Sequence, residues 1–140
     1  MVYADTSVLL ALFLNEPKTS DAWRWVGQQQ VGSIMASDWT ITEFSSALAV
    51  KVRMKAIDEN THQKVLFAVK RFASNELTLI QPEKADFHRA AELCDRWQMG
   101  LRAGDALHLA IAERHGLTVC TLDLGMSTAA LALGLPCETL

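Results

Sequence analysis

The stretch V-Y-A-D-T-S at residues 2–7 is followed by the apolar run V-L-L-A-L-F-L at residues 8–14. Its first residues favour a short β-strand over residues 2–4, and the residues after them have the length and spacing of a helix over 7–14. Asp5 stands at the junction between the two. A buried strand that leads through a short junction into a helix is the repeating unit of α/β domains.

The same alternation of short apolar runs and longer segments of helical period continues along the chain. It predicts an α/β domain with a central, mostly parallel sheet of about five strands flanked by helices. The expected strands are residues 2–4, 33–36, 77–80, 118–122 and 137–139. The expected helices are residues 7–14, 20–29, 40–54, 60–73, 82–98, 105–115 and 126–133.

Local signals support these boundaries. Pro82 suits a first helical turn, Ser20 suits an N-cap, and Gly116 and Gly134 suit the ends of helices. The connections are short, and no repeat or low-complexity segment interrupts them. A chain of 140 residues with a hydrophobic fraction of 50% is therefore expected to form one domain, residues 1–140, that needs no disulfide or metal for its stability.

Nothing in the sequence indicates export or a membrane. No basic residue precedes the apolar run at residues 8–14, and Glu16-Pro17 follows it where a signal peptide has small residues. No apolar stretch approaches the roughly 18 residues of a membrane span. The 3 cysteines lack C-x-x-C spacing and fit buried thiols in a reducing compartment. We therefore expect a cytoplasmic protein.

The formal net charge of −3 argues against a generally basic surface that holds nucleic acid. The charge is uneven, however, because residues 51–71 contain six basic residues and two acids. Lys51, Arg53 and Lys55 begin this stretch. It is either a solvated helix face or a surface that contacts RNA phosphates.

Four acids stand at junctions between the expected strands and helices. Asp5 ends the first strand, Glu43 stands in T-I-T-E-F, Asp105 begins a helix in R-A-G-D-A-L-H, and Asp123 follows the strand V-C-T-L. Each alone is explained as a helix cap or first-turn acid, and Thr40-x-x-Glu43 matches a capping box. Together they stand where strands end and helices begin, which is the edge of a parallel sheet where such folds bind ligands.

Such a cluster needs a counter-ion. Two carboxylates about 5 Å apart repel by roughly 3 kcal/mol at an effective dielectric near 20. Mg²⁺, with Mn²⁺ as a substitute, suits carboxylate ligands, whereas no His and Cys motif supports zinc. Setting these four acids aside leaves 12 acids against 13 basic residues, so the net charge no longer argues against a nucleic-acid partner.

Carboxylates that hold a metal, without a nucleophilic Ser or Cys motif or a Gly-rich loop, indicate attack by metal-activated water on a phosphodiester. We expect Asp5 and Asp105 to ligate the metal, with Asp123 as a direct ligand or one that acts through water. Glu43 would be a general base or an acid behind the ligands. His108, one helical turn after Asp105, either approaches the site or, as we expect, lies on an ordinary helix face. Three hydroxyls flank the acids, either as partners of metal waters or only in caps and strands: Thr6, Ser7 and Thr121.

Four segments resemble the successive motifs of PIN-domain nucleases, most closely the VapC-type toxins of toxin–antitoxin pairs. They are D-T-S from Asp5, T-I-T-E-F-S-S-A-L-A from Thr40, R-A-G-D-A-L-H-L-A-I-A from Arg102, and T-L-D-L-G-M-S-T-A-A-L-A-L-G-L-P from Thr121. The resemblance covers essentially the whole chain. It implies a Mg²⁺-dependent endoribonuclease that acts on RNA, is usually a homodimer, and is neutralised by a cognate antitoxin.

The resemblance places the family's acidic residues on the four acids named above. Many relatives have a basic side chain just after the last acid, where this chain has Leu124-Gly125. Arg102 is a candidate for that phosphate contact, or else it forms an ion pair at the surface.

Two alternatives differ in what the acids do. A receiver-type phospho-acceptor needs a pair of acids after the first strand and a lysine after the last long one, whereas Asp5 stands alone and Asp123 occupies the second place. A PIN-like partner-binding module would have weak or lost nuclease activity. Three tryptophans pack in the core or supply a partner surface: Trp23, Trp25 and Trp39.

Overall fold

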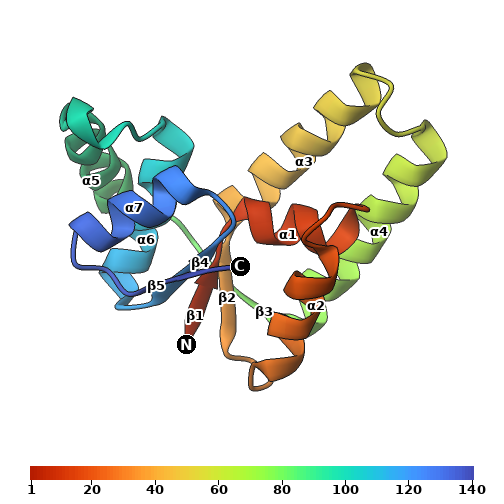
Figure 1. The fold of residues 1–140 in the computed structure, drawn as a ribbon, viewed down its shortest axis with the longest axis horizontal. Helices are drawn as coiled ribbons and strands as arrows, with labels where there is room; N and C mark the ends of the chain where they lie inside the picture. The colour runs from red at the N-terminus through yellow and green to blue at the C-terminus, as the bar shows by residue number, and fades with distance from the viewer.

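The computed structural model describes all 140 residues and contains one five-stranded sheet with helices on both faces (Figure 1). The strands are β1 (Val2–Ala4), β2 (Ile34–Ser37), β3 (Leu77–Ile80), β4 (Thr118–Thr121) and β5 (Cys137–Thr139). Their order is β3-β2-β1-β4-β5, and every pairing is parallel. The predicted α/β fold is confirmed, and the sheet is entirely rather than mostly parallel.

Helices return the chain from the end of one parallel strand to the start of the next. They are α1 (Thr6–Phe13), α2 (Thr19–Gln28), α3 (Asp38–Arg53), α4 (Glu59–Glu76), α5 (Lys84–Asp95), α6 (Ala103–His115) and α7 (Leu124–Ala132), with a short 3₁₀ turn η1 (Trp97–Met99). Helices α1, α3 and α7 follow strands directly, and α6 must end where β4 begins. All four helices therefore start at the carboxyl edge of the sheet.

All seven helices begin one or two residues away from their predicted starts, and two of the predicted start signals are wrong. The α5 helix begins at Lys84 rather than Pro82, because the backbone N–H of Glu83 donates to Asp86 Oδ2 at 2.8 Å and starts the helix there. It also ends at Asp95, short of the predicted residue 98. The α2 helix begins at Thr19, so Ser20 is already inside it.

The two faces of the sheet carry separate hydrophobic cores. One lies under α1 to α4 and includes Val8, Phe44 and Leu48. The other lies under α5 to α7 and includes Leu109 and Met126. The central strands are covered on both sides, as parallel strands usually are. None of the helices has the length and apolar character needed to cross a membrane.

Candidate active site

Asp5 is held at the end of β1 by groups from helix α1 and strand β4. Its Oδ1 accepts the backbone N–H of Val8 at 3.2 Å and the hydroxyl of Ser7 at 2.6 Å, so it caps α1. Its Oδ2 accepts the hydroxyl of Thr121 at 2.6 Å, because the pairing of β1 with β4 brings that residue alongside. Asp5 is buried, and desolvation raises its pKa although the hydroxyls of Ser7 and Thr121 oppose the rise.

Asp123 lies beside Asp5 through the same pair of hydroxyls. The hydroxyl oxygen of Thr121 accepts the backbone N–H of Asp123 at 2.9 Å, and that of Ser7 accepts the N–H of Leu122 at 2.8 Å. Asp123 also caps α7, because its Oδ1 accepts the N–H of Met126 at 2.8 Å. Asp5 and Asp123 therefore each cap a helix and also lie at the edge of the sheet.

Glu43 lies in the second turn of α3, not at its start. The predicted capping box of Thr40 with Glu43 is wrong, because Ser37 caps the helix and pairs with Thr40. This leaves the Glu43 carboxylate free to cross to α1 and α6. Its Oε2 accepts the hydroxyl of Thr6 and lies 2.9 Å from His108 Nε2. The hydrogen bond from His108 lowers the pKa of Glu43, and burial opposes this.

Asp105 is the third residue of α6 and brings the fourth carboxyl to the same edge. Burial raises its pKa, the Arg102 backbone opposes the rise, and the charges of Asp123 and Glu43 add to it. The pKa of Asp105 therefore depends on the charges of Asp123 and Glu43, although each of these acids comes from a different segment of the chain. The tertiary fold has placed four acids from four junctions along one edge.

The chemistry of these side chains indicates whether they could bind a divalent cation. No three of the acids lie close enough together in the structure to hold a metal ion, so a shared ion requires their side chains to turn toward one another. The donors are carboxylate oxygens with hydroxyls beside them, which suits a hard cation. Positive charge would also relieve the repulsion that Asp105 receives from its neighbours. The four acids and the hydroxyls beside them therefore fit a divalent cation in charge and in donor chemistry.

His108 contributes to this edge, contrary to the prediction of an ordinary helix face. It is buried, and it contacts Glu43, Thr6 and Tyr3. Residues three apart on a helix share a face, so its spacing from Asp105 was the one signal in the sequence. Tyr3 carries no such signal and joins the site only through this contact.

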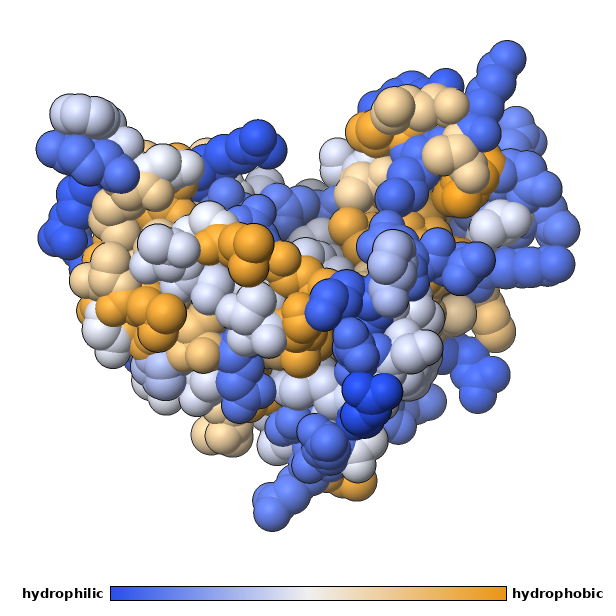
Figure 2. All heavy atoms as spheres, viewed as in Figure 1, coloured by the Kyte–Doolittle hydropathy of each residue, from blue (hydrophilic) through white to orange (hydrophobic).

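A hollow opens above the carboxyl edge, between the lobe of α5 to α7 and the projecting pair α3 and α4 (Figure 2). Arg102 is exposed and precedes α6, three residues before Asp105. It is thus close in sequence and in space to the acidic edge. No ion pair holds its guanidinium in the structure, so the alternative of a surface ion pair finds no partner.

The predicted basic contacts lie farther from the acids. Lys51 and Arg53 are in the last turn of α3, and Lys55 follows the helix. Ten residues of helix separate Glu43 from Arg53, which is about 15 Å. Lys51 is paired with Glu16 at 3.2 Å. These residues are placed at the tip of the projecting helices and not at the acidic edge.

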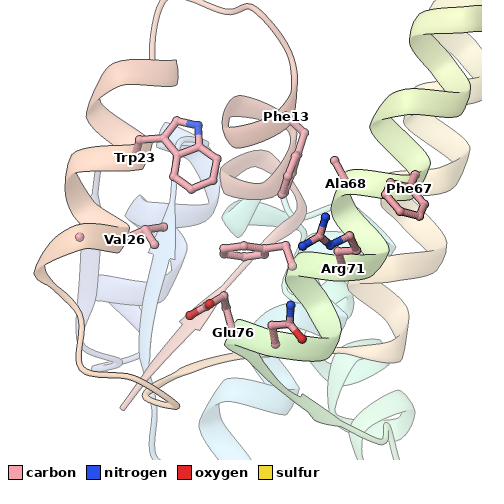
Figure 3. Close-up of a pocket in the computed structure, with 10 residues that line it drawn as sticks. Phe13, Trp23, Val26, Phe67, Ala68, Arg71 and Glu76 are labelled. Carbon is pink, nitrogen blue, oxygen red and sulfur yellow. The ribbon is translucent and has the colours of Figure 1, made fainter.

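A separate, mostly apolar groove lies between α1, α2 and α4 (Figure 3). It has a volume of about 630 Å³, and its walls include the packed rings of Phe13, Trp23 and Phe72. Trp23 is partly exposed on it, whereas Trp25 is buried in the core. None of the four acids lines this groove. Glu76 is the one acid that lines it, so the groove has no group of several carboxylates, and the acidic edge is the candidate active site.

The chain matches a known family over most of its length. The sequence pattern of the PIN domain matches residues 2–131. The chain belongs to the PIN domain family. Members of this family are nucleases, and PIN-domain nucleases generally use divalent metals. No curated protein matches the chain.

Solved structures similar to this PIN domain include toxins and toxin–antitoxin complexes. The sarcin–ricin loop cleaving toxin VapC20 of Mycobacterium tuberculosis is 17% identical with a TM-score of 0.74, covering 92% of this chain and 95% of its own. FitAcB from Neisseria gonorrhoeae is 18% identical with a TM-score of 0.75, covering 99% and 97%. VapBC2 from Rickettsia felis, bound to promoter DNA, is 16% identical with a TM-score of 0.67, covering 100% and 99%. At these low identities, the TM-scores establish a shared fold alone.

Proposed function

We propose that this chain is a metal-dependent endoribonuclease that acts as the toxin of a type II toxin–antitoxin pair. The observation that carries the proposal is that Asp5, Glu43, Asp105 and Asp123 lie along one edge of the sheet, where the charges of Asp123 and Glu43 contribute to the raised pKa of Asp105. Membership of the PIN family supports hydrolysis of a phosphodiester. A similar structure that is described as a sarcin–ricin loop cleaving toxin is consistent with RNA as the substrate.

Asp5, Asp105 and Asp123 are the residues that would hold the metal, which we propose is Mg²⁺, with Mn²⁺ as a substitute. When bound, the cation supplies polarisation of the scissile phosphate and neutralises its charge. Ser7 and Thr121 orient the Asp5 carboxylate through its two oxygens. These hydrogen bonds keep the ligand in one rotamer before the substrate arrives.

Glu43 is the proposed general base. Its lowered pKa keeps the carboxylate ionised at neutral pH. Oε2 is occupied by the hydroxyl of Thr6 and by His108, whereas Oε1 accepts no hydrogen bond in the structure. Oε1 is therefore the atom that takes the proton from the attacking water. The proposed base thus has one oxygen for its support and one for the reaction.

The direct test is cleavage of RNA by the purified chain. We expect fragments with Mg²⁺ or Mn²⁺, loss of cleavage with a chelator, and recovery when the cation is returned in excess. Cleavage that continues at the same rate in the chelator would contradict the metal-dependent reaction. No cleavage of any RNA in either cation would favour the alternative, a PIN-like partner-binding module with weak or lost activity.

Gly104→Ala should impair the base without removing an acid. A Cβ at Gly104 would lie 2.5 Å from Glu43 Oε1, so the carboxylate must move. We expect a decrease in cleavage of about 10- to 100-fold, because small displacements of a catalytic group have effects of this size. The thermal midpoint should stay the same or rise, since alanine favours a helix over glycine. Gly27→Ala in α2, with nothing within 4 Å, is the control, and equal cleavage by the two variants would contradict the role of Glu43.

Arg102 is proposed to contact RNA near the cut, and the tip of α3 to contact its backbone farther away. Replacing Lys51, Arg53 and Lys55 together with Gln should weaken RNA binding. For single-stranded RNA, the slope of log affinity against log salt should become shallower by about 2, because the counterions of three phosphates would no longer be released on binding. Binding measured over a range of salt concentrations tests this.

A charge-matched control removes three cations from other surfaces and should leave the slope unchanged. It carries Gln at Lys18, Lys84 and Arg96. Equal slopes for the two triple variants would show that the α3 tip is only a solvated face.

The partners proposed beside RNA are a cognate antitoxin and a second copy of this chain. Similar structures that are complexes of toxin with antitoxin, some with DNA, support the first. A short neighbouring reading frame for a small DNA-binding protein, whose co-expression relieves growth arrest caused by this chain, would distinguish a toxin from a bare binding module. Sedimentation of the purified chain tests the homodimer.

A further inference from the structure

His108 stands in a buried chain of polar groups that ends at Glu43. Its side chain is 2% exposed. Its Nε2 lies 2.9 Å from Glu43 Oε2, and its Nδ1 lies 2.8 Å from the hydroxyl of Tyr3. That hydroxyl also lies 2.8 Å from Ser37 Oγ. The ring therefore connects β1, α3 and α6, and each of these elements carries or leads into one of the four acids.

The neighbours of the ring decide which nitrogen carries its proton. An ionised Glu43 carboxylate can only accept, so Nε2 must donate to it. Burial raises the pKa of Tyr3, so the phenol stays protonated and can donate to Nδ1 of a neutral ring. The hydroxyl of Ser37 can then donate to the Tyr3 oxygen. In this order every group of the chain has a partner, which a buried polar network requires.

We propose that His108, which donates from Nε2, is a positioning residue that holds the Glu43 carboxylate by Oε2 and directs Oε1 to the reaction. Tyr3 acts one step behind it by holding the ring at Nδ1. The inference rests on the proposed nuclease function and adds a residue that is not one of the four acids.

A second donor is needed because one hydroxyl does not determine how a carboxylate is turned. Thr6 binds Oε2 from α1, while His108 binds the same oxygen from α6. With both donors on Oε2, the carboxylate is restrained between two helices, and Oε1 faces the first turn of α6 at Gly104. Loss of His108 would leave Glu43 tied at one side only.

Two substitutions separate the contact with Glu43 from the contact with Tyr3. The amide of His108→Gln reaches the place of Nε2, and that of His108→Asn reaches only the place of Nδ1. Both put a neutral amide in the same buried site, and the thermal midpoint of each is measured beside its cleavage rate. We expect His108→Asn to lower kcat about 10- to 100-fold with little change in KM, and His108→Gln to stay within about threefold of the parent.

Equal loss of kcat in both variants, at matched thermal stability, would overturn the proposal and reduce His108 to a structural residue. A change confined to KM would overturn it as well, because a positioned base acts on the chemical step.

A second measurement is independent of cleavage. The carboxyl carbon of Glu43, followed by NMR over pH, should titrate at higher pH in His108→Asn than in the parent, and close to the parent in His108→Gln. If no RNA is cut by the parent, the nuclease function fails while this titration still decides the contact. If RNA is cut but Glu43 titrates alike in all three proteins, the positioning role fails alone.

Discussion

Asp5→Asn is expected to lower RNA cleavage at least about 100-fold while the fold is kept. The substitution removes one charge from the proposed metal site. Mutation of a group that supports a metal ligand typically lowers activity about 10- to 100-fold, and loss of the ligand itself should lower it at least as much as the upper end of that range. Asn retains an oxygen for the N–H of Val8 and the hydroxyl of Ser7, and its NH₂ can donate to Thr121 Oγ1. Initial cleavage rates and thermal denaturation should be measured on the same preparation.

Asp58→Asn is the matched control. Asp58 caps α4 as Asp5 caps α1, because its Oδ1 accepts the N–H of Thr61 at 2.7 Å, but it is exposed and away from the acidic edge. If the two variants cleave RNA equally well, Asp5 is a helix cap and nothing more. If Asp5→Asn unfolds, its inactivity does not test metal binding. Metal binding is then tested by the stability of Asp105→Asn with and without Mg²⁺.

Metal binding is expected to raise the stability of the parent by about 2.7 kcal/mol when Mg²⁺ is a hundredfold above its dissociation constant. For a chain of 140 residues this corresponds to a rise in thermal midpoint of roughly 8 °C. Asp105→Asn should show a much smaller rise, because it lacks one ligand. The measurement is thermal denaturation with and without Mg²⁺, and it needs no RNA.

The same variant should show an opposite effect without metal. The pKa of Asp105 is raised in the folded protein, so its ionisation destabilises the metal-free fold as pH rises from the unfolded value near 3.9 through the folded one. Asn has no charge to penalise. We therefore expect the midpoint of Asp105→Asn to rise relative to the parent as pH increases from about 3 to 7.

Asp95→Asn at the exposed end of α5 is the control for both measurements. Its midpoint should follow the parent at each pH and respond equally to Mg²⁺. A parent that gains no stability in Mg²⁺ or Mn²⁺, or an Asp105→Asn variant that gains as much, would contradict a metal site that contains Asp105.

The alternation of strands and helices could be predicted because each buried parallel strand is a short apolar run, visible without knowledge of its neighbours. The helix starts were less reliable where a distant group supports the cap. Asp86 lies at the start of α5 and is held by Arg114 of α6, whose Nε donates to its Oδ1 at 2.7 Å. Pro82 is a good local start signal, but no local rule includes that ion pair.

Glu43 shows the same limit of prediction from neighbouring residues, here within the candidate site. Its spacing from Thr40 favours a capping box, and the structure gives the cap to Ser37, whose hydroxyl meets Tyr3 from the adjacent strand. The carboxylate is thereby free to reach His108 on α6. Neither contact could be predicted from spacing, because the partners are 34 and 65 residues apart in the chain.

The sequence by itself determined the α/β class and the family, and it singled out four acids as candidates for one site, because periodicity and junction chemistry are properties of neighbouring residues. Only the tertiary structure decided the strand order β3-β2-β1-β4-β5 and what each acid contacts there. That order places β1 between β2 and β4, so that Asp5 meets Thr121, and Tyr3 meets both Ser37 and His108. Burial and hydrogen bonding depend on atoms that are close in space, whatever their distance along the chain.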